Sequence, residues 1–238
     1  MAITKVIDIV RRAEKILNDE SGVRWTRPEL QDWINDSYKE IVLLRPDANS
    51  ATATVTLAVG TRQKLGDAGS INLPSALRVL DVVRNMAVTS NKRAIRFMTR
   101  RVMDDQLPGW HAETGSVNVV HWMFDIRTPK EFLVYPPATS LARVELAYSS
   151  VPTAHALTSA ALDPAGADTT VINIDDIYAN VMLDYLLYRA YSKDAEYAAN
   201  GQRAINHINA FNASLGAKTS TDIATAPAAV TPMTQRGA

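Results

Sequence analysis

The residues with the clearest capacity for chemistry are histidines and adjacent carboxylates. The four histidines stand far apart, at His111, His121, His155 and His207. None follows another at the three- or four-residue spacing that puts two metal ligands on one helix face, and the chain has no cysteine. Adjacent helical residues point about 100° apart, so Asp104-Asp105 and Asp175-Asp176 are typical of helix caps and solvated turns. The sequence therefore predicts no catalytic, cofactor or metal site, and we expect the protein not to be an enzyme.

A basic segment is the strongest charge feature of the sequence. Six cations fall within residues 84–101, the last four being Arg93, Arg96, Arg100 and Arg101. A short helix is predicted over residues 94–105, and a helical segment here would place Arg93, Arg96 and Arg100 on one face, with Arg101 nearby. The interpretation we favour is a solvated face or ion pairs between subunits. The functional alternative is contact with a DNA backbone or with an acidic neighbouring subunit.

Composition narrows the class of protein. The 238 residues contain 25 Lys plus Arg and 25 Asp plus Glu, whereas proteins that coat nucleic acid are usually basic. Without cysteine there is no disulfide scaffold, thiolate zinc site or cysteine catalysis. No apolar run reaches the roughly 18–20 residues of a membrane span, and the N-terminus lacks a signal-peptide pattern. We expect a soluble protein that is made in the cytoplasm and has no membrane partner.

Two amphipathic helices are predicted near the N-terminus. Apolar residues recur at helical spacing over residues 4–18. Thr26 and Glu29 have the spacing of a capping box, which opens a second helix that Pro46 ends. A loop of about eight residues between the helices favours an antiparallel pair.

Alternating residues then indicate a small antiparallel sheet. Residues 120–126 and 132–135 are predicted to form a hairpin around the turn 127–130. Further strands are expected over residues 51–59, 77–86 and 144–148. Trp110, Trp122 and Phe124 fit either a core or an interface, and the core is the commoner role. Glycines at 60, 66 and 69 match no phosphate-binding motif and indicate loops.

Two more helices and a tail complete the pattern. Asp175 or Asp176 caps a helix that is apolar nearly all round and runs to Tyr191, so it should be the central buried one. A last helix is predicted from about Asp194 to Leu215, ended by Gly216. Residues 217–238 have too little apolar surface to offset their ordering entropy, which predicts a flexible arm.

These elements predict an α+β fold. The N- and C-terminal helices, residues 1–50 with 171–216, form an antiparallel helical bundle. Residues 51–170 form a small antiparallel β-rich region inserted between them, and residues 217–238 are a flexible C-terminal tail.

Three segments resemble a known family. The helix start at Trp25–Asp36 (WTRPELQDWIND), its end at Leu43–Ala48 (LLRPDA) and the late element Asp184–Tyr197 (DYLLYRAYSKDAEY) are similar to head-to-tail connector, or adaptor, proteins of short-tailed phages, the tail-tubular-A-like group. The resemblance implies a structural virion protein at the head–tail junction, with neither catalytic residues nor a cofactor. It also implies a ring of about twelve copies, closed by a repeated head-to-tail interface, that extends the DNA channel.

The same resemblance supplies partners and roles. The implied partners are the portal protein, the tail nozzle protein, further copies of this chain and the genomic DNA passing through. The helical part would form the ring and the β-rich part would face the tail. The C-terminal arm would dock on the portal through Lys218, Thr219, Met233 and Arg236. The alternative function is a sequence-independent DNA-binding or packaging accessory protein that uses Arg93, Arg96, Arg100 and Arg101.

Overall fold

The computed structural model describes residues 3–225 except 67–70, 90, 164–167 and 198. The chain divides into two compact units, Arg45–Pro152 and the joined segments Met1–Leu44 and Thr153–Ala238. We call the first the β-rich unit and the second the helical unit. The described residues contain five α-helices and two sheets, so the predicted α+β class is confirmed. No helix among them has both the length and the apolar character that a bilayer span requires.

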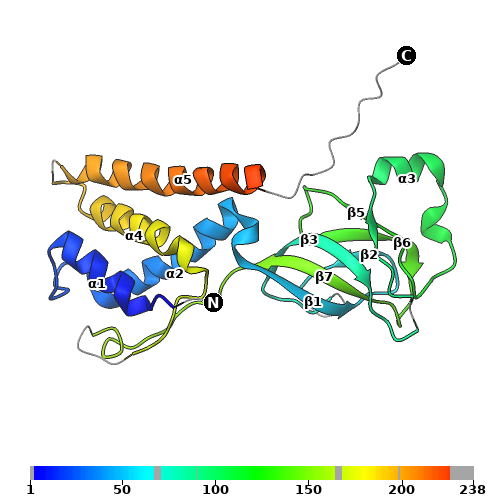
Figure 1. Ribbon diagram of the computed structural model, residues 1–238, viewed down its shortest axis with the longest axis horizontal. Coiled ribbons are helices and arrows are strands. Elements are labelled where there is room, and N and C mark those ends of the chain that lie inside the picture. The colour runs from blue at the N-terminus through cyan, green and yellow to red at the C-terminus, as the bar shows by residue number, and fades with distance from the viewer. Residues whose placement is uncertain (1–2, 67–70, 90, 164–167, 198, 226–238) are drawn as a thin grey trace, which may run out of the picture. The chain divides into compact units, whose positions relative to one another are not determined.

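The helical unit is built around its third α-helix. Its elements are α1 (Val6–Leu17), α2 (Arg27–Leu44), the 3₁₀ turn η3 (Asp176–Tyr178), α4 (Ala179–Lys193) and α5 (Asn200–Thr225). Helix α4 contacts α1, α2 and α5, and Figure 1 shows it between α5 and the two N-terminal helices. It is buried along most of its length, as its nearly continuous apolar sequence predicts.

Local signals explain most ends of these helices. Asn18 closes α1 in the left-handed conformation, with φ 55°, and its N–H donates to the Glu14 and Lys15 carbonyls. Pro46 follows the end of α2, as predicted. The Asp175 carboxylate accepts from the Ile177 N–H at 3.1 Å, so the predicted cap is present, on η3. The Glu29 carboxylate lies 2.7 Å from Lys193 Nζ and so links α2 to α4, a role that the capping-box interpretation missed.

The predicted end of the last helix is wrong. Helix α5 passes through Gly216 and continues to Thr225, so the flexible arm does not begin at residue 217. Glycine permits a left-handed helix end but does not impose it, and here a helix-favouring alanine follows. Lys218 and Thr219 therefore belong to α5, while Met233 and Arg236 lie outside the described residues.

The β-rich unit contains two sheets where the sequence predicts one. The first has the order β1–β7–β3, formed antiparallel by β1 (Ser50–Thr56), β7 (Arg143–Ser150) and β3 (Ala76–Asn85). The second has the order β2–β6–β5–β4, formed by β2 (Gly60–Lys64), β6 (Glu131–Ala138), β5 (His121–Phe124) and β4 (Arg96–Phe97). Only the β4–β5 pair among these is parallel. The remaining elements are η1 (Pro46–Asn49), α3 (Arg100–Gln106) and η2 (Trp110–Ala112).

Each part of this unit has an apolar core. Side chains from both sheets, including Val82, Trp122, Phe132 and Leu146, form one buried cluster. A smaller cluster of Met103, Trp110 and Met123 joins α3 and η2 to the second sheet. Trp110 and Trp122 are therefore core residues. The predicted hairpin is confirmed, because His121 pairs with Tyr135 and Phe124 with Phe132 across β5 and β6.

Candidate functional site: a groove beside α3

The four arginines of the basic segment do not share a helix face. Arg93 precedes β4, Arg96 lies on β4, and only Arg100 and Arg101 are in α3. Backbone pairing keeps the segment before α3 extended: the Ile95 N–H donates to the Val83 carbonyl and the Arg96 N–H to the Val120 carbonyl, each at 3.0 Å. The helix predicted over residues 94–105 is thus wrong in its first half. These long-range backbone bonds could not be read from local periodicity.

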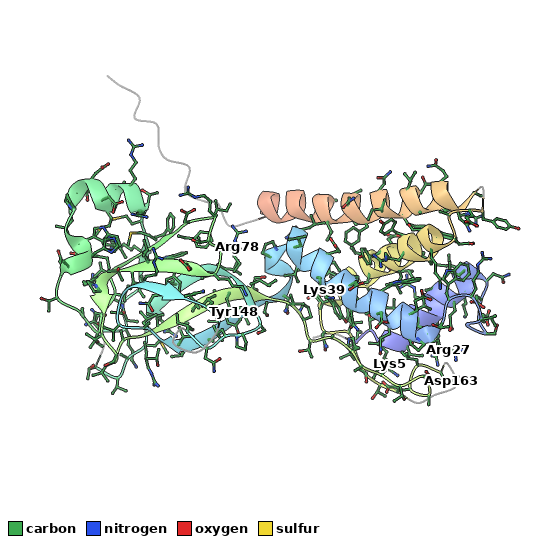
Figure 2. The ribbon with its side chains drawn as sticks, turned by 180° about the vertical axis from the view of Figure 1, so that it is seen from behind. Lys5, Arg27, Lys39, Arg78, Tyr148 and Asp163 are labelled. Carbon is green, nitrogen blue, oxygen red and sulfur yellow. The ribbon has the colours of Figure 1, made fainter. Side chains whose placement is uncertain are left out.

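Helix α3 instead forms one wall of a groove of about 920 Å³. The other walls are the end of β5, the β5–β6 turn and the start of β6, with one residue each from β2 and β3. Five arginines line it: Arg62, Arg78, Arg100, Arg101 and Arg127. The structure therefore brings Arg100 and Arg101 together with three arginines from distant segments and leaves Arg93 and Arg96 outside. The Arg78 side chain can be located on the β-rich unit in Figure 2.

Four carboxylates line the same groove and pair with four of these arginines. The N–O distances are 2.7 Å for Arg127–Asp125, 3.1 Å for Arg100–Asp104, 3.8 Å for Arg62–Glu131 and 4.0 Å for Arg101–Asp105. The arginine side chains of these pairs are exposed, so the pairs contribute little to stability. The groove is a surface of mixed charge rather than a uniformly positive one.

Hydrogen bonds keep two of these carboxylates ionised. The side chain and then the backbone N–H of Arg127 lower the pKa of Asp125 to about 2. The Trp110 indole N–H, which donates at 2.9 Å, is the largest cause of the lowered pKa of Asp104, and Arg100 adds to it. Both groups are therefore negative at any physiological pH.

The apolar side chains that line the groove lie on two faces of the second sheet. Met123 and Leu133 are on the face that packs against α3 and η2, and Phe124 and Phe132 are on the face that packs toward the first sheet. Met123 and Phe132 are buried, and Phe124 and Leu133 are half-buried. The Arg78 guanidinium lies over the Phe124 ring, 5.6 Å from its centroid. No carboxylate of the described residues pairs with Arg78. Sequence reasoning missed Arg62, Arg78 and Arg127, because their meeting depends on strand order and no local motif marks it.

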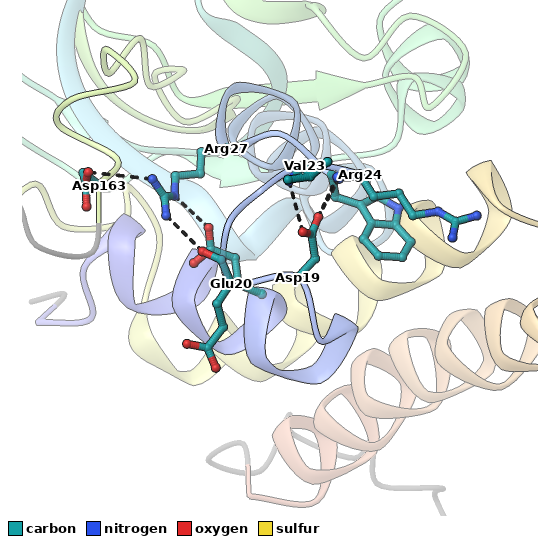
Figure 3. A network of polar contacts seen from close by, with 8 residues as sticks. Asp19, Glu20, Val23, Arg24, Arg27 and Asp163 are labelled. Atoms are coloured by element: carbon teal, nitrogen blue, oxygen red, sulfur yellow. Dashed lines mark hydrogen bonds and ion pairs between the residues drawn. The ribbon is translucent and has the colours of Figure 1, made fainter.

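The helical unit uses its charges differently. In the α1–α2 loop the Asp19 carboxylate accepts from the backbone N–H groups of Val23, Arg24 and Trp25, at 3.0, 2.8 and 2.9 Å (Figure 3). Burial raises the pKa of Asp19, but these bonds outweigh burial and leave it below 3.8. Arg27 Nε lies 2.7 Å from the buried Glu14 carboxylate, and its Nη1 lies 3.9 Å from Asp163.

Helix α2 also holds the segment that precedes η3. Tyr38 Oη lies 2.8 Å from His155 Nε2 and accepts from the Asn173 N–H at 3.0 Å. Since the hydroxyl has one proton, it donates that proton to a neutral His155. Asn35 exchanges two hydrogen bonds with the backbone of His155, at 2.8 and 2.9 Å. Burial lowers the pKa of His155 and raises that of Tyr38 to about 12, which makes this a structural network.

One family of known proteins matches this chain. The family model described as SU10 adaptor protein matches residues 4–233, which includes both units. A comparison with curated proteins gives no match. The described residues contain no group of three or more side chains suited to a metal ion.

Proposed function

Because this chain belongs to the SU10 adaptor protein family, we propose that it forms a ring between the portal and the tail nozzle of a phage. Membership makes the protein a phage adaptor, a structural component of the virion with partners at the head–tail junction. The finer proposal is a ring of about twelve copies that extends the DNA channel, assembled after synthesis in the host cytoplasm. We also propose that it has no enzymatic activity.

The family match carries this proposal, and helix α5 supports the ring. Its described part buries one stripe, Ala204, Phe211 and Leu215. From Ala204 to Ala217 the helix contains no Asp, Glu, Lys or Arg. The face opposite the stripe is therefore exposed and yet almost uncharged, and depletion of charge is typical of the centre of a protein–protein interface. We propose that an antiparallel bundle of N- and C-terminal helices meets neighbouring subunits through this face.

The C-terminal segment is proposed to dock on the portal. Lys218 and Thr219 lie on the last turns of α5, and Met233 and Arg236 follow in the sequence. Docking of this segment would tie ring formation to the presence of the portal. The β-rich unit would then face the tail.

Contact with DNA is proposed only as a weak contact during passage. Arg93 and Arg96 are exposed, and no carboxylate of the described residues pairs with either. The net charge of zero and the paired arginines of the groove support the adaptor over a sequence-independent DNA-binding or packaging factor.

Genetic loss of the protein tests the adaptor role. A phage carrying a nonsense mutation in this gene should accumulate DNA-filled heads and free tail components, and the intact gene supplied in trans should restore joining. Electron microscopy of lysates measures the fraction of joined particles. Normal particles without the protein would overturn the proposal.

A further inference from the structure

We propose that the groove beside α3 binds an acidic segment of the tail component that meets the β-rich unit, with an apolar side chain of that segment seated against Phe124 beside Arg78. The inference rests on the proposed adaptor role for the source of the segment. The chemistry of the segment is inferred from the groove alone.

The size and apolar lining of the groove fit a short peptide segment. Sites that enclose small ligands or side chains measure about 300–1,000 Å³, and this groove measures about 920 Å³. Its apolar lining includes the half-buried Phe124 beside Arg78, and Ile126, 73% exposed, also lines it. An apolar side chain placed there would remove this surface from water.

The charges of the groove select an anionic partner. Its lining has one more arginine than carboxylates, and Arg78 is the arginine that no described carboxylate pairs with. Arg78 is half-buried and lies against the Phe124 ring, so its guanidinium is held in place before a ligand arrives. An incoming carboxylate can accept two of its N–H groups at once. The exposed arginines at the rim can exchange their weak internal partners for further acidic side chains.

The same lining disfavours DNA. The phosphates of a bound strand would face four carboxylates, those of Asp104, Asp105, Asp125 and Glu131. The lowered pKa values of Asp104 and Asp125 keep these two ionised. A peptide avoids this repulsion because its acidic residues can be spaced to meet the arginines alone. The four carboxylates therefore disfavour DNA, whose charge is uniform, and still allow a peptide whose acidic residues are spaced to meet the arginines.

Binding of two probes to the full-length chain tests the inference. The first probe is a fluorescein-labelled peptide with the sequence Gly-Glu-Asp-Phe-Glu-Asp-Gly, and the second is a labelled 12-base-pair DNA duplex. Fluorescence anisotropy should show that the peptide binds at least about tenfold more tightly than the duplex, because only the duplex meets the four carboxylates with phosphate. Replacing the peptide's Phe with Ser should weaken binding severalfold.

Two groove variants and one control locate the site. Arg78→Glu should weaken peptide binding about tenfold or more, since it replaces an attractive contact with a repulsive one. Arg101→Glu should weaken binding by a smaller factor, and its 93% exposed side chain makes a folding defect implausible. The control is Arg143→Glu, an equal charge change on β7 outside the groove, which should bind as the unchanged protein does.

The outcomes separate this inference from the adaptor role. Peptide binding that both groove variants weaken, together with loss of tail-component binding by Arg78→Glu particles, supports it. Duplex binding as tight as peptide binding overturns it in favour of a DNA contact. If the protein associates with itself and Arg78→Glu abolishes that association, the groove binds a second copy of this chain and the inference is overturned. If the protein joins heads to tails but does not bind the peptide, the proposed role of the groove is wrong and the adaptor role stands. If the protein binds the peptide but phage particles form normally without the protein, the tail component is not the source of the segment that the groove binds.

Discussion

The Arg27–Glu14 pair of the helical unit and the ion pairs of the groove use the same groups in opposite surroundings. The Glu14 and Arg27 side chains are only 3% and 21% exposed, whereas the Arg127 side chain is 84% exposed. A buried carboxylate needs its partner, because burial without one leaves an uncompensated charge. An exposed arginine can change partners at little cost. The comparison teaches that the same kind of ion pair fixes the fold where it is enclosed, as at Glu14, and can exchange partners where it is exposed, as at Arg127.

Removing the buried cation should have the largest effect on stability. Arg27→Met leaves the Glu14 carboxylate without its Nε donor and should lower the free energy of unfolding of the helical unit by about 3 kcal/mol. Urea denaturation followed by circular dichroism measures this change. A loss below about 1 kcal/mol would mean that the pair resembles the exposed ones and would break the comparison.

The Tyr38 hydroxyl extends the comparison to neutral groups. Tyr38→Phe removes one donor and one acceptor from a buried network and should cost about 2 kcal/mol in urea denaturation. The matched control is Tyr148→Phe on β7, whose hydroxyl has no recorded partner among the described residues and should matter little. Equal losses in the two variants would show that the hydroxyl bonds are not what stabilises α2 against the following segment.

The helical unit should also depend on pH through His155. Burial lowers the pKa of this ring in the folded protein below 6.5, so the unfolded chain binds the proton more readily. Stability is therefore complete above pH 6.5 and falls as the pH drops through the folded pKa, with a slope of at most about 1.4 kcal/mol per pH unit. His155→Gln should reduce that slope between pH 7.5 and 5. An unchanged slope in the variant would assign the dependence to other groups.

The groove should give the smallest effect. Arg127→Gln removes the shortest of its ion pairs but should leave the urea midpoint nearly unchanged, even though the pKa of Asp125 is about 2, because both groups are exposed to solvent. Urea denaturation followed by circular dichroism, as for Arg27→Met, measures the change. A loss approaching that of Arg27→Met would show that the groove arginines belong to the folding framework.

The sequence predicted the elements that repeat a local pattern. The first two helices, the buried α4 and the β5–β6 hairpin follow from apolar spacing, proline and turn residues, and all four are present. Strand β2 was missed because Gly60, its first residue, indicated a loop and its other residues are polar, although Gln63 is fully buried. Helix α5 continues past Gly216, the residue predicted to end it, because a local cap is only one of several ways to end a helix.

The candidate site was predictable only in part. Arg100 and Arg101 were found as members of a charge run, but Arg62, Arg78 and Arg127 reach the groove from β2, β3 and the β5–β6 turn. Their approach depends on the order of strands in two sheets, which a single sequence does not specify. Among the carboxylates of the groove, Asp104 and Asp105 were interpreted as cap or turn residues, and Asp125 and Glu131 were not singled out.

Native mass spectrometry of the purified protein, alone and mixed with the portal protein of the same phage, tests the central claim most directly. The adaptor account predicts a monomer in isolation and a ring of fixed stoichiometry on the portal. Failure to associate with the portal, under conditions in which both proteins are folded, would contradict it.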